Sequence, residues 1–533
     1  MFMDSQGQTL WRRLAPAHKS AFFSCLVTGY LVHLYAFTNI IPNSDGLSRV
    51  FDTQQMTVSG RWFLHYASAL NDFTQMPAVI GLLSLLFLAL AAAFAVDLLA
   101  IRSKVLAGLT GAVIAAFPCM GYTFLYMFTA SAYCLAILLA VLSVWLARRG
   151  KLGWVAGVVL LALSMGTYQA YVTLAISLSL LVLFRETLNP DADFRGTFRL
   201  GLSLVAYLAV GAALYYSILM VFLKVKDLEL LSYLGMDAAS SGYPFGSLPS
   251  LIFRSYKQVV AFFFVPGSGD AFCSPFMAVL DLVAGLLGLV FLVSCFRKRG
   301  LHKDLWRVAG ALAMLALLPL GMNFMQVLSP YSIPTPLMKY AFVCVYLAVF
   351  LLADQADAIP EPARLQKAAL SCTALWCAGV LLFCLNTNNL LYTASAQAHR
   401  ATESYATRLM TRIESCPGYE PGMEIVIVGA ISTDALRADI PSYRQVAHYS
   451  LSTDTVAPLN KHIYYYLSDW LNIPVEEPEE SVLTEAAASP EFAQMPLYPQ
   501  EGSIQVLDGQ LVVKVQETYT PKSDFEIAYE NRR

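Results

Sequence analysis

The chain has 533 residues, of which 57% are hydrophobic and 14% are charged, and its mean hydropathy is +0.56. Soluble domains carry about 25% charged residues, so this composition excludes a soluble multi-domain protein. The net charge of −2 conceals a split, because residues 1–388 hold 25 basic and 17 acidic residues whereas residues 389–533 hold 10 and 20. An acidic tail and the lack of a basic arm argue against nucleic acid as a partner.

Eleven apolar blocks are long enough, or nearly so, to cross a bilayer, which takes about 20 residues. The first block is not followed by a small-residue cleavage site, which favours a membrane anchor over a signal peptide. We therefore predict an α-helical polytopic membrane protein with about 11 transmembrane helices over residues 1–388. The blocks cover residues 20–41, 78–100, 105–120, 128–147, 152–167, 170–184, 200–223, 275–296, 308–328, 335–353 and 367–388.

The basic residues predict the orientation of these helices, because lysine and arginine favour cytoplasmic loops. With a cytoplasmic N-terminus, 18 of the 25 basic residues in residues 1–388 fall in inner segments. An odd number of helices then places residues 389–533 outside the cytoplasm. The outer loops 42–76 and 224–274 are long, and long loops in a compact protein are usually functional. We therefore expect the chemistry on the outer face of the membrane.

Residues 389–533 are predicted to form a small extracytoplasmic α/β domain. A helix is expected over residues 392–413, and the apolar run 424–429 is typical of a buried strand. A run that alternates polar and apolar residues around Asp508-Gly509 predicts a hairpin. A linker rich in proline and glutamate, residues 474–490, separates the two parts. Two cysteines lie outside the apolar blocks and are candidates for a bridge: Cys273 and Cys416.

The first outer loop carries a carboxylate close to the membrane. Asp45 lies four residues after Ile41, where the first apolar block ends, and Arg49 would share a helix face with it at i+4. A carboxylate held at the bilayer surface can act on a group whose other end lies in lipid. The alternatives are a solvated loop carboxylate or a helix cap. We favour a catalytic role for Asp45, because Gly46 follows it and a basic residue is near.

Several segments of the chain resemble a known family. They are Asp45-Gly-Leu-Ser-Arg49 with Gly60-Arg-Trp62, then Tyr122 to Tyr133, then Gly166-Thr-Tyr-Gln-Ala-Tyr171. In order and placement they resemble the serotype-converting O-antigen glucosyltransferases (Gtr-type). That family belongs to the GT-C class of multi-span enzymes, which use polyprenyl-phosphate sugars, and the resemblance covers about the first 350 residues. Members often have two adjacent acids in the first loop, whereas Ser44 precedes Asp45 here, so the resemblance implies a single catalytic base.

Transfer from a lipid-phosphate donor needs a base for the acceptor hydroxyl and positive charge where the phosphate leaves. Arginine binds phosphate through two N–H groups, and lysine provides a point charge. The outer-face candidates for binding the donor phosphate are Arg49, Arg61, Arg254, Lys257 and Lys339. Each could instead contact lipid headgroups. Tyr168, Gln169 and Tyr171 are candidates for sugar binding, with an interfacial aromatic belt as the alternative.

A few polar residues lie inside or beside the apolar blocks. Asp281 is a functional candidate because an intramembrane acid is costly, unless it is the structural partner of a basic residue or a backbone group. Asp97 is expected to pair with Arg102 or Lys104. His33 has no second ligand at metal spacing, so we expect a packing or hydrogen-bonded histidine. No metal and no cofactor are predicted.

These features predict an integral-membrane inverting glycosyltransferase in a bacterial inner membrane, moving a glucosyl residue from polyprenyl phosphate to an extracytoplasmic glycan such as O-antigen. Its partners would be the lipid-linked sugar donor, the glycan acceptor and membrane lipids. A lipid-linked glycan flippase or transporter would instead need paired mid-membrane charges and symmetrical halves, whereas the charges here collect at one face. A glycan polymerase or ligase would use a diphosphate-linked glycan. A scaffold that only displays the tail would have no use for the long first loop.

Overall fold

The computed structural model describes residues 15–47, 57–70, 76–228, 230, 245–266, 274–330, 335–358, 362–431, 440–446 and 460–519. The chain divides into two compact units. The first unit contains Met1–Ile40 and Asp52–Leu390, and the second contains Ile41–Phe51 and Leu391–Arg533. Residues 41–51, at the start of the first outer loop, therefore group with the C-terminal tail.

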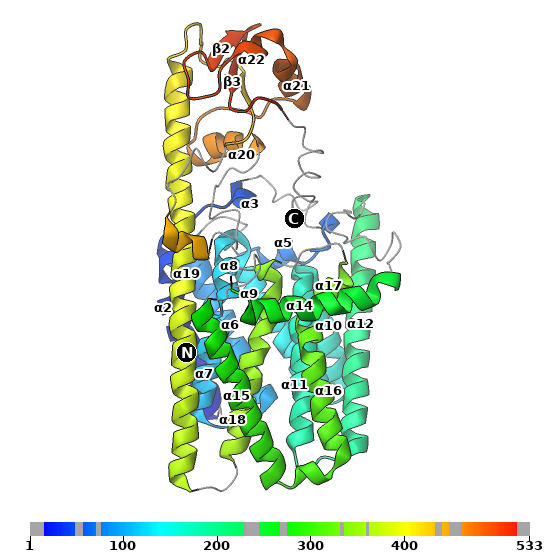
Figure 1. The fold of residues 1–533 in the computed structure, drawn as a ribbon. Helices are drawn as coiled ribbons and strands as arrows, with labels where there is room; N and C mark the ends of the chain where they lie inside the picture. Colours follow the sequence, from blue (N-terminus) through cyan, green and yellow to red (C-terminus); the bar gives the residue numbers. More distant parts are fainter. Residues whose placement is uncertain are drawn as a thin grey trace, which may run out of the picture. The chain divides into compact units, whose positions relative to one another are not determined.

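The first unit is a bundle of long apolar helices (Figure 1). All eleven predicted spans are present as helices that are long and apolar enough to cross a membrane. Large apolar side chains lie exposed on them, for example Leu82 at 69% and Leu382 at 65%, as expected where lipid covers the surface. The predicted fold class, a polytopic helical membrane protein, is confirmed. The spans are Pro16–Thr38 (α2), Pro77–Leu99 (α6), Lys104–Leu125, Met127–Ala147 (α9), Gly150–Thr167 (α10), Gln169–Leu188, Phe194–Lys226 (α12), Pro275–Lys298 (α15), Leu305–Met322 (α16), Pro336–Asp357 and Arg364–Glu414.

Three of these spans break or change helix type along their length. Pro118 breaks the third span, because proline has no backbone N–H to continue the helix. The sixth and tenth spans each begin with a 3-10 helix. The pieces are α7 (Lys104–Ala116), α8 (Pro118–Leu125), η1 (Gln169–Tyr171), α11 (Val172–Leu188), η5 (Pro336–Val343) and α18 (Cys344–Asp357). Irregular backbone at membrane depth is tolerated where protein surrounds it, and here η5 packs against both α8 and η1.

The break after α7 leaves three carbonyl groups without partners in the helix, and side chains from other segments bind them. Losing such a bond to a buried carbonyl costs about 1–3 kcal/mol. The pairs are Tyr340 Oη to Ile114 O (2.9 Å), His33 Nε2 to Ala115 O (2.8 Å) and Asn388 Nδ2 to Ala116 O (2.9 Å). His33 is therefore a hydrogen-bonded histidine, as predicted.

Asp97 is paired differently from the prediction. Its carboxylate accepts a hydrogen bond from Trp145 Nε1 (2.6 Å) and lies 3.0 Å from Arg149 Nη2. The expected pairing with Arg102 or Lys104 was wrong, because the end of α9 brings a tryptophan and an arginine to the end of α6. Sequence proximity did not determine the partner.

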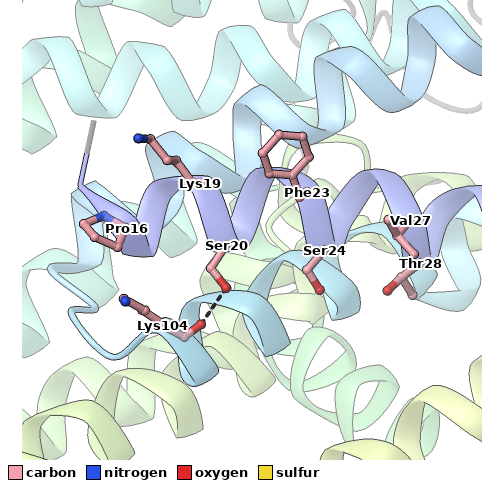
Figure 2. A pocket seen from close by; sticks show the side chains of 8 residues that line it. All are labelled: Pro16, Lys19, Ser20, Phe23, Ser24, Val27, Thr28 and Lys104. Carbon is pink, nitrogen blue, oxygen red and sulfur yellow. Dashed lines mark hydrogen bonds between the residues drawn. The ribbon is translucent and has the colours of Figure 1, made fainter. Parts of the chain in front are cut away.

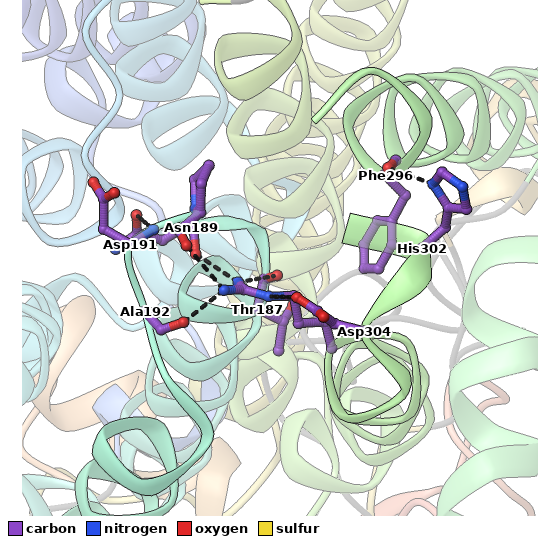
Figure 3. A network of polar contacts seen from close by, with 9 residues as sticks. Thr187, Asn189, Asp191, Ala192, Phe296, His302 and Asp304 are labelled. Atoms are coloured by element: carbon purple, nitrogen blue, oxygen red, sulfur yellow. Dashed lines mark hydrogen bonds and ion pairs between the residues drawn. The ribbon is translucent and has the colours of Figure 1, made fainter. Parts of the chain in front are cut away.

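Arg307, at the start of α16, is almost completely buried and organises the loop between α11 and α12. Its guanidinium donates to the carbonyl groups of Asn189, Pro190 and Ala192, and its Nε lies 2.9 Å from Asp304 Oδ2. Figure 3 shows Asn189 and Ala192 on one segment and Asp304 on another, joined in one network of polar contacts. This basic residue is therefore fully used in holding the fold together.

The helix α14 (Leu248–Phe264) runs across the spanning helices of the first unit instead of alongside them (Figure 1). Its buried residues recur at helical spacing on one face, as in Leu251, Ser255 and Val259. An amphipathic helix of this kind is typical of the membrane surface. The remaining short elements of the first unit are α5 (Leu64–Ala67), η3 (Phe245–Ser247), η4 (Leu301–Lys303) and α17 (Met325–Leu328).

The second unit contains a three-stranded sheet of order β1-β3-β2. The strand β1 pairs with β3 in parallel, and β2 pairs with β3 as an antiparallel hairpin. The hairpin turns at Asp508 and Gly509, which both have positive φ, so the predicted strand and hairpin are confirmed. The elements are α3 (Ser44–Leu47), the C-terminal part of α19 (Ala363–Glu414), β1 (Ile425–Val428), η7 (Pro441–Gln445), α20 (Asn460–Tyr465), the π-helix η9 (Tyr466–Trp470), α21 (Glu480–Ala488), α22 (Pro490–Gln494), β2 (Ile504–Leu507) and β3 (Gln510–Lys514).

Each face of the sheet has its own apolar core. Residues of α21 and α22 cover one face, where Leu483 and Phe492 pack against Val426 and Val512. The predicted linker over residues 474–490 was therefore wrong in its second half. Residues Glu480–Ala488 form the helix α21, and its Leu483 is buried against the sheet. The other face packs against α19, α20 and, from the N-terminal part of the chain, α3.

Candidate functional site

Arg61 lies among tyrosines in the first unit. Its Nη1 donates a hydrogen bond to Tyr133 Oη (3.2 Å), and its guanidinium carbon lies 5.8 Å from the ring centre of Tyr168. Tyr168 stacks on Tyr133 with 4.7 Å between ring centres. Tyr171 meets Tyr168 edge-on at 5.4 Å and Tyr340 at 6.3 Å. These five residues form what we call the tyrosine–arginine cluster, which joins the first outer loop to α9, η1 and η5.

The turn that presents Arg61 is fixed by hydrogen bonds from two other segments. Gln169 Nε2 donates to Ser59 O (2.7 Å), and Tyr215 Oη donates to Gly60 O (3.0 Å). Gly60 has a φ of +80°, a conformation that favours glycine. A Cβ atom at Gly60 would also meet Gln169 Nε2 and lie 2.6 Å from Tyr215 Oη. The turn therefore needs glycine for both its backbone and its surroundings.

Trp62 fastens the same turn to the end of α10. Its ring stacks on Phe222 at 5.8 Å, and Phe63 N donates to Gly166 O (2.7 Å). A Cβ atom at Gly166 would lie 2.6 Å from the indole ring of Trp62. The segments Gly60 to Trp62 and Gly166 to Tyr171 thus interlock, although about 100 residues separate them in the chain.

The residues predicted to bind the sugar hold the cluster together. The side chains of Tyr168 and Tyr171 are 5% and 1% exposed, and the amide of Gln169 donates to the backbone of the Arg61 turn. Tyr171 Oη is buried without a hydrogen-bond partner among the residues that the structure describes. Arg61 is partly exposed. The cluster can therefore present one oriented guanidinium, held by a phenol and a ring face, to an anionic ligand.

Lys339 lies next to Tyr340 on η5 and is 0% exposed. A charged group that is buried at membrane depth is costly and marks a functional or structural site. Arg254 and Lys257 are instead exposed on α14. Because α14 is helical over both residues, which are three apart, they lie on one face. Arg49 lies outside the described residues.

Asp45 belongs to the second unit, on the single helical turn α3. Asn43 begins this turn: its Oδ1 accepts a hydrogen bond from Gly46 N (2.8 Å), and its carbonyl accepts one from Leu47 N (3.1 Å). The cap of this turn is therefore Asn43.

The model of the family described as Glucosyl transferase GtrII matches residues 34–352, which is more than half of the chain. The chain belongs to the Glucosyl transferase GtrII family. No curated protein and no solved structure matches it. The family resemblance inferred from the motifs is confirmed, and this GtrII protein is a glucosyltransferase by family with the helices of a multi-pass membrane protein. The matched region includes the whole tyrosine–arginine cluster and α3, and ends before the tail.

Asp281 of this GtrII protein is a buried acid on α15. Its Oδ1 accepts a hydrogen bond from Tyr346 Oη (2.7 Å) on α18. The partner is thus a hydroxyl group, not the basic residue or backbone group that the sequence left open. Its carboxylate links two spanning helices, and neither residue belongs to the tyrosine–arginine cluster.

A groove of about 600 Å³ opens between α2 and the start of α7. Figure 2 shows Lys19 and Lys104 at one end of it and Phe23 and Val27 toward the other. Ser20 Oγ donates to Lys104 O (2.7 Å) and ties the two helices together. The groove shares no residue with the tyrosine–arginine cluster, so it is separate from the candidate transfer site.

Sequence reasoning missed Tyr215 and Tyr340, and it named Tyr133 only as the end of a motif. No local pattern distinguishes Tyr215 or Tyr340 from other tyrosines in apolar helices. Their importance comes from where the helices cross. The Asn43 cap could have been predicted, because asparagine is a preferred residue at the N-cap of a helix. The sequence interpretation considered only Asp45, two residues later, as a cap.

Proposed function

We propose that this GtrII protein is an inverting glucosyltransferase that uses a polyprenyl-phosphate donor and an extracytoplasmic glycan acceptor such as O-antigen. The observation that carries the proposal is Arg61, a partly exposed guanidinium held by Tyr133 and Tyr168 inside the family-matched region. A planar guanidinium with a fixed orientation suits a phosphate group. A lipid-linked donor would keep its tail in the bilayer and bring its phosphate and sugar to the membrane surface.

In the proposed reaction, the Asp45 carboxylate takes the proton of the acceptor hydroxyl as the hydroxyl oxygen attacks the anomeric carbon. The bond between that carbon and the phosphate oxygen breaks, and its electron pair leaves with the polyprenyl phosphate. One displacement inverts the anomeric configuration. Arg61 stabilises the negative charge that develops on the leaving phosphate.

The other predicted basic residues would support donor binding in different ways. Arg254 and Lys257 are exposed on α14, a position suited to phosphate groups at the membrane surface. Lys339 is buried and precedes Tyr340 on η5. Its positive charge would stabilise the bound phosphate from inside the protein. Arg49 keeps its predicted role in phosphate binding. Tyr168, Gln169 and Tyr171 would shape the sugar pocket by holding the Arg61 turn.

The proposal is tested with purified protein in liposomes, given polyprenyl-phosphate glucose or a nucleotide-activated glucose as donor and a lipid-linked O-antigen glycan as acceptor. We expect transfer only from the lipid-linked donor. Arg61→Gln should lower kcat/KM for the donor by about tenfold or more, whereas Arg195→Gln, an exposed arginine at the start of α12, should leave it unchanged. Equal transfer from the nucleotide sugar, or equal effects of the two variants, would overturn the proposal.

We also propose that the N-terminus lies in the cytoplasm of a bacterium and that the tail lies outside the inner membrane. The support is the bias of basic residues toward alternate segments, 18 of the 25 in residues 1–388. A reporter that is active only in the cytoplasm, fused after Arg533, should be silent. An active reporter would reverse the proposed orientation of the tail.

A further inference from the structure

The turn α3 is built into the apolar core of the second unit. The Leu47 side chain is 3% exposed and lies in the core on one face of the sheet. The other members of this core come from the tail, more than 350 residues later in the chain. They include Tyr405, Leu409, Ile463, Leu467 and Val513. Among the described residues of the first outer loop, Leu47 therefore joins a core that the tail otherwise forms.

A helix of four residues is not stable by itself, because forming the first turn fixes several residues for few hydrogen bonds. In α3 the turn begins at Asn43, which accepts from Gly46 N and Leu47 N. It ends at Leu47, which the core buries. Asp45 lies between this cap and this anchor, so the backbone that carries its carboxylate is held from both sides.

We infer that Leu47 is a positioning residue, through which the C-terminal tail holds the turn that carries Asp45. The inference rests on the proposed function, in which Asp45 is the base. Its consequence is that part of the catalytic machinery depends on a core whose other members lie outside the family-matched residues 34–352. The tail would then be a structural part of the transferase, in addition to any role in docking the glycan.

The chain offers a matched control on the opposite face of the same sheet. Leu483 is 2% exposed and packs in the second core with Val428 and Phe492, a core that contains none of the α3 side chains that the structure describes. Leu47→Ala and Leu483→Ala remove the same atoms from the same unit. Only the first change frees α3 from its anchor. Leu47→Met keeps most of the apolar volume and should preserve the anchor.

The test measures kcat and the donor KM of the full chain in liposomes, with protease resistance of the tail as the folding control. We expect Leu47→Ala to lower kcat by about 10²-fold, the effect of a misplaced catalytic group, with little change in the donor KM. Leu47→Met should restore most of kcat, and Leu483→Ala should keep near-normal kcat with a similar loss of protease resistance. Combining Leu47→Ala with Asp45→Glu, which already displaces the carboxylate, should give less than the product of the two effects.

The outcomes separate the inference from the proposed function. If Asp45→Asn abolishes transfer but Leu47→Ala behaves like Leu483→Ala, the positioning role is wrong and the base remains. Multiplicative effects in the double variant would also overturn the positioning role. If Asp45→Asn transfers normally, the proposed base is wrong, and the inference that depends on it falls as well.

Discussion

The tyrosine–arginine cluster and the turn α3 show two ways of holding a candidate catalytic side chain. In the cluster, polar and aromatic side chains from three other segments fix Arg61 and its turn through hydrogen bonds and ring contacts. In α3, one buried leucine and one asparagine cap fix the backbone around Asp45. The first arrangement uses tyrosine, glutamine and glycine, which leave motifs in the sequence. The second uses an ordinary apolar contact, which leaves none.

The difference follows from the surroundings of each region. In the membrane-spanning unit, lipid tails are as apolar as the side chains, so the hydrophobic effect does not drive the helices together. Specific packing and hydrogen bonds must hold them instead. The tail has a core that excludes water, and there a single leucine is a sufficient anchor. Substitutions in the two regions should therefore fail in different ways.

The largest effect should come from Asp45. Asp45→Asn keeps the shape of the side chain but cannot accept a proton at neutral pH, so transfer should fall by about 10²-fold or more. The tail should remain protease-resistant, because Leu47 and Asn43 keep α3 in place. Anomeric NMR of the wild-type product should show inversion.

Near-normal transfer by folded Asp45→Asn protein would remove Asp45 as the base, and Asp52, Asp72 and Asp281 would be the next residues to test. A product that retains the donor's anomeric configuration would point to a covalent sugar–enzyme intermediate and would exclude the single displacement.

The next effect concerns the Arg61 turn. Gly60→Ala places a Cβ atom against Gln169 and Tyr215, so it should displace Arg61 and lower kcat/KM for the donor by about tenfold or more. Gly150→Ala is the matched control, because Gly150 has a similar φ of +74° but a Cβ atom there would meet no other atom within 4 Å. Both variants should lose similar stability from backbone strain. Equal losses of transfer in the two variants would mean that backbone strain causes the loss, and not the displacement of the turn from Gln169 and Tyr215.

A smaller effect should appear in the stability of the membrane-spanning unit. Asn388→Ala removes the donor to Ala116 O, a carbonyl on a completely buried residue. The free energy of unfolding should fall by about 1–3 kcal/mol, measured as a lower midpoint of thermal unfolding in detergent. Ser217→Ala is the control, because Ser217 Oγ bonds only to Ala213 O of its own helix at an exposed site. A loss no larger than in this control would show that the carbonyl finds another donor.

The smallest effect is a pH dependence confined to the tail. Burial lowers the pKa of His462 on α20 to about 3, with the neighbouring Lys461 adding to the shift. The unfolded segment binds a proton near pH 6.5 and the folded one does not, so stability should be lost as the pH falls from about 6.5 toward 3. On the same helix, Tyr464 Oη accepts a hydrogen bond from Ile427 N of β1 (2.6 Å). The protection of the β1 amides, which is their exchange rate compared with the intrinsic rate at the same pH, should therefore fall on acidification.

His462→Gln should remove much of this loss of protection while Arg61-dependent transfer at neutral pH stays unchanged. An equal loss of protection in the variant and the wild type would assign the pH dependence to other groups in the tail.

Much of the fold could be predicted from local patterns. Each span needs only enough consecutive apolar residues to match the bilayer, so composition located all eleven. The hairpin needs positive φ at Asp508 and Gly509, which those residue types accept. Arg61 could be selected because it lies in a motif and carries charge on the predicted outer face.

The tertiary structure decided which residues meet. Asp97 pairs with Arg149 and not with its sequence neighbours. The Gln169 amide donates a hydrogen bond to the Arg61 turn, and Leu47 packs in the core of the tail. These contacts join segments from about 50 to more than 350 residues apart, and no local pattern encodes such pairings. The sequence by itself determined how each segment folds, because hydropathy, proline and turn residues act within a few residues. Only the packing of distant segments determined what each polar side chain binds, because a buried polar group takes whichever partner the fold brings within hydrogen-bond distance.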